Sequence, residues 1–183
     1  MDESARRDFG EFVAARSGHL IRLAYVLTGD QHAAEDLLQS ALTKAAAHWG
    51  RIHSAPEAYV KQIIYREQVS WWRHRSRRPE TTMARVPDQV ATPPSAGVAG
   101  VAGVEDRLAL YEALRALPAR KRAVLVLRYL EDLPEAQVAD ILGCSVGTVR
   151  SQTHKAIAQL KSVLTPLDLT TTQARPRTAQ ARP

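Results

Sequence analysis

Two stretches of the chain carry side chains that suit nucleic-acid binding, and the first is a run of arginine and tryptophan. Between Arg66 and Arg78 there are five arginines, one glutamate and the adjacent pair Trp71 and Trp72. Arginines neutralise phosphates, and each base that stacks on an aromatic face contributes about 1 to 3 kcal/mol. Because neighbouring helical residues point about 100° apart, one tryptophan should lie in the core and the other outside it. The run favours contact with single-stranded nucleic acid; the alternative is a solvated basic helix end.

The second stretch, residues 133–160, has the pattern of a helix-turn-helix. Val138 and Leu142 share one face of a short helix, Gly143 suits a left-handed turn, and Ser145 can cap the next helix. That second helix leaves small and polar residues outside near its N-terminus, the end that a recognition helix directs at base edges. These residues are Gly147, Thr148, Arg150, Ser151 and Lys155. We therefore predict that this helix reads duplex DNA; the alternative is a helical hairpin used only for packing.

The sequence carries no motif of catalysis or of metal binding. Its six histidines show no HExxH or paired ligand spacing, and it has no P-loop, GxSxG or Gly-rich dinucleotide motif. Cys144, the single cysteine, cannot form an internal disulfide or a zinc framework and suits a small apolar position in the turn. We expect no enzyme, no cofactor, no catalytic residue and no metal ligand.

Composition favours a polyanionic partner and excludes a membrane protein. Lys and Arg number 25 against 19 Asp and Glu in 183 residues, which gives a net charge of +6 and a pI near 9.8. Most of the basic residues are arginine, which suits phosphates and guanine edges, although a GC-rich genome produces the same usage. The longest uncharged stretch, residues 89–104, is broken by prolines and glycines, and no apolar segment of signal-peptide length begins the chain. We expect a cytoplasmic protein without membrane contact.

The chain divides where its composition shifts. Residues 79–104 are 26 residues with four prolines, three glycines and no aromatic residue, which indicates a flexible linker. Residues 166–183 are rich in proline and arginine, which indicates a disordered basic tail. The segments 1–78 and 105–165 both show helical spacing of apolar residues. We predict an all-α fold of two small helical domains joined by the linker.

Local signals place three helices in the first domain. The first has a candidate break at Ser17 and Gly18, and it ends at Gly29, after which Asp30 can cap a second helix. The second helix has an apolar stripe from which Asp36 and other polar residues are excluded. A third helix opens beside Pro56 and ends in the basic run.

The order of these features resembles a known family. A helical module with DLLQSAL and then the Trp- and Arg-rich helix, a linker, LP-x-x-x-R-x-V-L-V-L-R-Y and GCSVGTVRSQTHKA are together similar to bacterial sigma-70 family sigma factors of the small extracytoplasmic-function (ECF) group. The likeness covers about residues 9–78, as a sigma-2-like bundle, and 105–164, as a sigma-4-like helix-turn-helix domain. The recognition helix, SVGTV before a basic residue and SQT, resembles an actinobacterial sigma-E-like subgroup.

The resemblance implies three sets of site residues. Binding of core RNA polymerase, through the clamp helices of its largest subunit, is assigned to Asp36, Gln39 and Leu42. Reading and holding open the promoter −10 element is assigned to Arg51, Lys61, Tyr65, Arg66, Val69, Trp72 and Arg73. Reading of the −35 element is assigned to Ser145, Thr148, Arg150, Ser151 and Lys155.

Three positions depart from the family pattern. Ser40 stands where the family often has an acidic residue after the core-binding glutamine, which affects the electrostatics of docking and not the place of the site. Gln152 and Thr153 replace a commoner Arg-Leu pair. The promoter sequence therefore does not transfer from the family.

The function implied is that of a sigma factor, which directs promoter-specific transcription initiation and stabilises the melted −10 strand. Its partners would be core RNA polymerase, at the clamp helices and the flap region, and promoter DNA, with an anti-sigma factor as a further candidate. The alternative is a free-standing helix-turn-helix repressor or activator, although no heptad seam for a dimer is evident. A third alternative is an adaptor that sequesters an anti-sigma protein. Such a protein would have an acidic or degenerate second module, and the intact recognition helix argues against it.

The linker length is compatible with two separated DNA readers. A flexible chain of that length spans roughly 30 Å on average and about 85 Å when fully extended. Two DNA elements about two helical turns apart are separated by about 70 Å. Because stretching costs entropy, the polymerase must hold the linker extended, and DNA binding by the two modules of the free chain should be weakly coupled.

Overall fold

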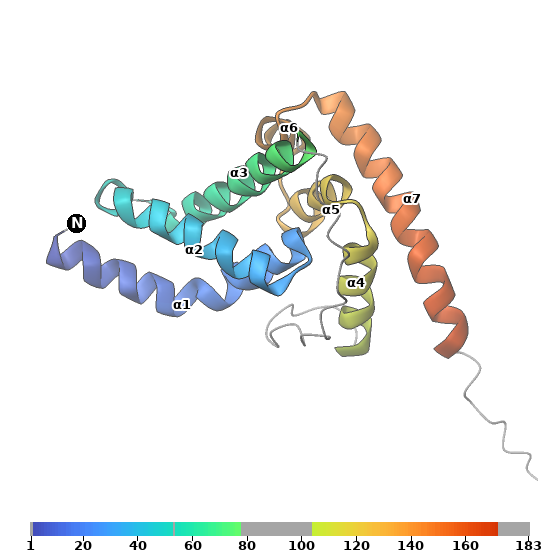
Figure 1. Cartoon of the computed structure of the whole chain (residues 1–183), viewed down its shortest axis with the longest axis horizontal. Helices are drawn as coiled ribbons and strands as arrows, with labels where there is room; N and C mark the ends of the chain where they lie inside the picture. Colours follow the sequence, from blue (N-terminus) through green and yellow to red (C-terminus); the bar gives the residue numbers. More distant parts are fainter. Residues whose placement is uncertain (1, 53, 78–103, 172–183) are drawn as a thin grey trace, which may run out of the picture.

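The computed structural model describes residues 2–52, 54–77 and 104–171, and every regular element in these ranges is helical (Figure 1). The linker predicted at 79–104 lies outside this part of the chain except for Val104, and so do residues 172–183 of the tail. The first module consists of α1 (Glu3–Thr28), α2 (Gln31–His48), the short 3-10 helix η1 (Trp49–Arg51) and α3 (Pro56–Arg77). The second consists of α4 (Val104–Ala116), α5 (Ala119–Leu125), the π-helical turn η2 (Val126–Leu130), α6 (Glu135–Leu142) and α7 (Val146–Thr171).

Side chains and a glycine set the ends of the first helices. The Asp2 carboxylate accepts from the Ala5 N–H at 2.8 Å to cap α1, and Asp30 does the same for α2 through the Ala33 N–H. Gly29 ends α1 with φ +75°, the left-handed conformation that glycine adopts without strain. This turn confirms the expected stop and cap. The expected break at residues 17 and 18 is wrong: α1 is continuous, because a glycine inside a helix costs only about 1 kcal/mol and packing holds the helix on both sides of it.

The second module has the helix-turn-helix geometry that its sequence predicts. Gly143 adopts φ +60° after α6, and the Ser145 hydroxyl accepts from the Thr148 N–H at 3.1 Å at the start of α7. Helix α7 continues to Thr171, whereas the tail was expected from residue 166. Pro166 removes a backbone donor and crowds the carbonyl one turn earlier, which is why the sequence favours an end there, yet the helix continues past it.

Buried apolar side chains join both modules into one connected core. Leu20, Leu27, Val60 and Ile64 of the first module are fully buried, as are the second module's Val124, Leu127, Val138 and Val149. Full burial of such a side chain is worth about 1.5 to 3 kcal/mol. These buried side chains recur at the helical spacing of apolar residues seen in the sequence.

The two modules pack against each other, which the sequence did not indicate. Helices α4 and α5 contact α1, and α6 lies against α3 (Figure 1). Arg122 of α5 is 5% exposed and donates from Nε to the Leu27 carbonyl at 3.1 Å and from Nη2 to the Thr28 carbonyl at 2.6 Å. These carbonyls belong to the last turn of α1, whose partial negative charge favours a guanidinium. The modules of the free chain are therefore coupled by direct contacts.

Two kinds of feature are absent from the described part of the chain. No helix in this part of the chain is both long and apolar enough to cross a membrane. No group of three or more His, Cys, Asp and Glu side chains gathers there in a way that could hold a metal ion.

Candidate polymerase and promoter interface

Helix α2 presents the residues assigned to polymerase binding on its outer side. Asp36 and Gln39 are exposed, and Leu42 is half-buried at the edge of the core. The opposite face is buried against α1 and α3 through Ala34, Leu37, Leu38, Ala41 and Ala45. The expectation that Asp36 and Gln39 lie outside the apolar stripe is confirmed, and both side chains are free of the core.

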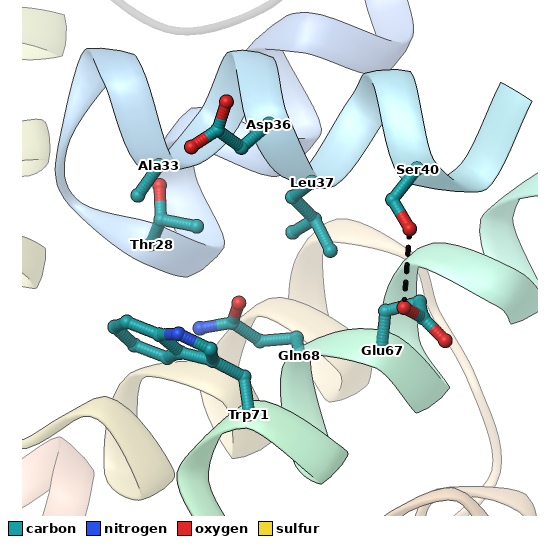
Figure 2. Close-up of a pocket in the computed structure, with 8 residues that line it drawn as sticks. All are labelled: Thr28, Ala33, Asp36, Leu37, Ser40, Glu67, Gln68 and Trp71. Atoms are coloured by element: carbon teal, nitrogen blue, oxygen red, sulfur yellow. Dashed lines mark hydrogen bonds between the residues drawn. The ribbon is translucent and has the colours of Figure 1, made fainter. Parts of the chain in front are cut away.

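A pocket of about 280 Å³ lies beside Asp36, between α2 and α3 (Figure 2). Figure 2 shows Asp36 on α2 facing Trp71 and Gln68 on α3 across this pocket, with Ser40 at one end. The Ser40 hydroxyl donates to the Glu67 carboxylate at 3.3 Å, and Lys44 also pairs with Glu67. The serine that departs from the family pattern therefore ties α2 to an acidic residue of α3.

Sequence reasoning missed Glu67 and Trp71 as neighbours of Asp36. Trp71 is 46% exposed, the larger exposure of the two adjacent tryptophans. Trp72 packs against the core, and its buried Nε1 has no hydrogen-bond partner among the described residues. One inner and one outer tryptophan confirm the helical argument, but the outer one is Trp71, whereas the −10 set contains Trp72. The exposed side of α3 depends on where α2 packs, which spacing within α3 does not reveal.

The −10 residues divide between an open and a covered face. Arg51 and Arg66 are exposed. Tyr65 and Val69 are 4% and 6% exposed, and Lys61 is half-buried. The side chain of Arg73 lies outside the described part of the chain. The structure therefore brings Lys61 and Tyr65 together, and it buries Tyr65 and Val69.

Glu131 of the second module covers Lys61 and Tyr65. Its Oε2 accepts from the Tyr65 hydroxyl at 2.6 Å and lies 3.0 Å from the Lys61 Nζ. Burial, and then the Glu131 carboxylate, raise the pKa of the Tyr65 phenol far above its ordinary value, so the phenol is a donor at neutral pH.

Glu57 anchors a second charged group on the same side of α3. Its carboxylate lies 2.9 Å from His19 Nδ1, 3.4 Å from Arg16 Nε and 3.5 Å from Lys61 Nζ. Partial burial disfavours the carboxylate, but the His19 hydrogen bond and the nearby cations outweigh it and lower the pKa of Glu57. Lys61 is therefore held between two carboxylates, Glu57 and Glu131.

The recognition helix α7 presents its predicted residues at its N-terminus. Ser145, Arg150, Ser151 and Lys155 are exposed, and Thr148 is half-buried beside the cap. Arg150 Nε donates to Glu135 of α6 at 2.7 Å. Sequence reasoning missed Glu135, because that contact depends on the crossing of α6 and α7. In the free chain the Arg150 guanidinium is therefore paired with a carboxylate of the preceding helix.

Comparisons with known proteins agree with both modules. Residues 12–78 match the family model described as sigma-70 region 2, and residues 107–160 match that described as sigma-70, region 4. The chain is 33% identical over 166 residues to the RNA polymerase sigma-E factor of Streptomyces coelicolor, covering 88% of this chain and 89% of the relative. It is 34% identical over 152 residues to the ECF RNA polymerase sigma factor SigL of Mycobacterium tuberculosis, covering 82% and 85%.

A solved structure supports the same fold. The sigma factor RpoE of Bartonella quintana, in complex with the anti-sigma factor NepR, superposes with a TM-score of 0.62 and 26% sequence identity. That match covers 87% of this chain and 98% of RpoE. Fold and recognition helix thus define a helical, two-module DNA-binding protein. The chain belongs to the sigma-70 family of bacterial RNA polymerase sigma factors, in its extracytoplasmic-function group, as its sequence motifs indicated.

Proposed function

We propose that this sigma factor docks on core RNA polymerase through the outer face of α2 and reads a promoter with α3 and α7. As a sigma-70 family member it directs promoter-specific transcription initiation. One observation supports the polymerase contact on α2: Asp36 and Gln39 are exposed on a helix whose opposite face is buried. The same chain carries a capped recognition helix with an exposed N-terminus, which supports the assignment of DNA reading to α7. We place the polymerase contact at the clamp helices of the largest subunit, with the flap region as a second contact.

The two DNA elements are divided between the modules. The −10 strand is captured by one residue of η1 and six of α3: Arg51, and Lys61, Tyr65, Arg66, Val69, Trp72 and Arg73. The −35 duplex is read by Ser145, Thr148, Arg150, Ser151 and Lys155 at the start of α7. This division makes residues 1–78 and 105–165 the two functional domains, joined by the linker of 79–104, and α7 extends the second of them to Thr171 before the basic tail.

The chain acts by binding and makes or breaks no covalent bond. Opening of the duplex exchanges base stacking and pairing for contacts of the unpaired bases with protein, and aromatic stacking contributes about 1 to 3 kcal/mol per base. A specificity subunit of this kind needs no cofactor and is not an enzyme. It works where the polymerase and the chromosome are, in the cytoplasm, and an anti-sigma factor is a further proposed partner.

Transcription with purified components tests this function. The protein added to core RNA polymerase should confer run-off transcription from a limited set of promoters. Asp36→Ala with Gln39→Ala should weaken association with core and reduce that transcription by tenfold or more, since about 1.4 kcal/mol of lost contact is tenfold in affinity. Asp8→Ala, which removes the same charge from exposed α1, is the matched control and should leave transcription unchanged.

A free-standing regulator makes the opposite prediction. It would give no promoter-specific transcription with core, and it would bind an operator tightly by itself. That result with a correctly folded preparation would overturn the proposed function.

A further inference from the structure

We propose that Glu131 is an internal blocker of the −10 site, which holds the free chain closed until the modules separate. Its carboxylate occupies Lys61 and Tyr65, two of the side chains proposed to capture the unpaired −10 strand. This inference rests on the proposed function, because it concerns what those two side chains bind when DNA is absent.

The contact uses a single oxygen of Glu131 for both partners. Tyr65 Oη donates to Oε2 at 2.6 Å, and Lys61 Nζ lies 3.0 Å from the same atom. The Glu131 side chain is 8% exposed, and that of Lys61 is 20% exposed. An ammonium and a phenol hydroxyl that converge on one anionic oxygen form a site for an anion.

A DNA phosphate offers the same chemistry as the carboxylate. Both present anionic oxygens that accept charge-assisted hydrogen bonds from lysine and from hydroxyl donors. Because the two donors already share one carboxylate oxygen, a phosphate can bind there only after Glu131 leaves. The second module therefore excludes the −10 strand from α3 by occupying its anion-binding donors.

Burial of the Glu131 carboxylate makes its two polar partners necessary. A carboxylate removed from water costs free energy unless it is paired and hydrogen-bonded, and Glu131 has both a cation and a hydroxyl. Loss of the closed arrangement leaves Glu131 and Lys61 free to regain water, which limits the cost of opening. The contact is a latch that a competing partner can displace.

A second contact between the modules supports the same closed arrangement, at the end of α1. Arg122 caps the last turn of α1 through the Leu27 and Thr28 carbonyls, and its guanidinium fills the space beside Gly29. Arg122 and Glu131 both come from the α5–η2 segment and its end, and they hold α1 and α3 respectively. The Glu131 contact therefore forms part of a larger interface in which the second module also binds α1.

The latch is open to solvent along one side. Lys61, Tyr65 and Glu131 line a crevice of about 720 Å³ between the modules, together with Phe12, Arg16 and Gln137. A competing anion can therefore approach the donors before the modules have separated.

Distance measurements on the full chain test the contact. Cys144→Ser removes the native thiol, and Ala15→Cys with Ala158→Cys places one spin label on exposed positions of α1 and α7 each. Glu131→Lys should shift the label distances to longer and broader values by placing two ammonium groups together. Lys61→Glu should do the same. The double variant should give shorter and narrower distances than either single variant, because the pair is re-formed with exchanged charges.

DNA binding tests the blocking role. The probe is the single-stranded non-template −10 region of a promoter that the holoenzyme uses, with a fluorescent label. The apparent affinity of a binding site is reduced by the fraction of molecules in which it is accessible, so a parent chain open about a tenth of the time gains about tenfold when the latch is lost. Glu131→Lys should show that gain. Glu112→Lys makes the same charge change at an exposed site in α4 and should show only a small electrostatic gain.

The outcomes separate this inference from the proposed function. Distances for Glu131→Lys that equal those of the parent would refute the latch, whether or not the holoenzyme transcribes. Longer distances with a single-strand affinity equal to that of Glu112→Lys would show a structural contact that blocks nothing. Absence of promoter-specific transcription with core would refute the function itself.

Discussion

Gly29, at the junction of the two modules, meets two structural requirements. Gly29 ends α1 in the left-handed conformation, and a Cβ built there would lie 2.6 Å from Arg122 Nη1. The sequence predicted the turn from the glycine alone. The close approach of a guanidinium from the second module is an additional demand that only the packed structure shows.

Gly29→Ala should lower the free energy of unfolding by about 2 to 3 kcal/mol. The left-handed conformation costs a residue with a Cβ about 1 to 2 kcal/mol, and displacement of Arg122 adds to that cost. Urea denaturation of the full chain measures the change. Gly18→Ala is the matched control within α1, because its Cβ would meet only Arg22 at 3.8 Å, and it should stabilise the protein by about 0.5 to 1 kcal/mol. Equal effects of the two changes would contradict this account.

At the scale of the element, the residues at the N-terminus of α7 that we propose to contact DNA already make contacts within the free chain. Its N-terminus is capped by Ser145, and its arginine pairs with Glu135 of α6 in the free chain. An exposed ion pair of this kind is worth less than about 1 kcal/mol, so DNA can displace it at small cost.

Arg150→Ala should weaken binding at the −35 element by about 1 to 3 kcal/mol if the guanidinium reads a base, and discrimination among sequences should fall with it. Footprinting of the holoenzyme on −35 variants measures both effects. Lys161→Ala removes a positive charge much further along the same helix and serves as the control. An affinity that falls equally on every variant would assign Arg150 to a phosphate, and an unchanged footprint would remove it from the interface.

At the scale of the whole molecule, the closed free chain and a chain bound to two DNA elements differ in shape. The modules share one core cluster in the free chain and contact each other through α1, α3, α5 and α6. Two promoter elements about two helical turns apart require the readers to separate by about 70 Å, which the 26 residues of 79–104 can span only when nearly extended.

Core RNA polymerase should therefore lengthen the distance between spin labels at Ala15→Cys and Ala158→Cys. Binding of both modules to separated sites on core supplies the free energy that breaks the contacts between them. Pulsed dipolar spectroscopy with and without core measures the shift, and the Asp36→Ala with Gln39→Ala variant should show less of it at the same core concentration. An unchanged distance in a transcribing holoenzyme would contradict the opening.

Local sequence alone determined the helical class, the turn at Gly29 and the Ser145 cap, because periodicity and capping act within a few residues. It also placed Asp36 and Gln39 outside the core of α2. It did not determine the continuity of α1 through Gly18 or the end of α7 at Thr171. Only the tertiary structure decided which face of α3 is covered. Tyr65 and Glu131 are 66 residues apart, and Arg122 and Leu27 are 95 apart. Such contacts depend on how whole helices dock, and no local spacing encodes that geometry.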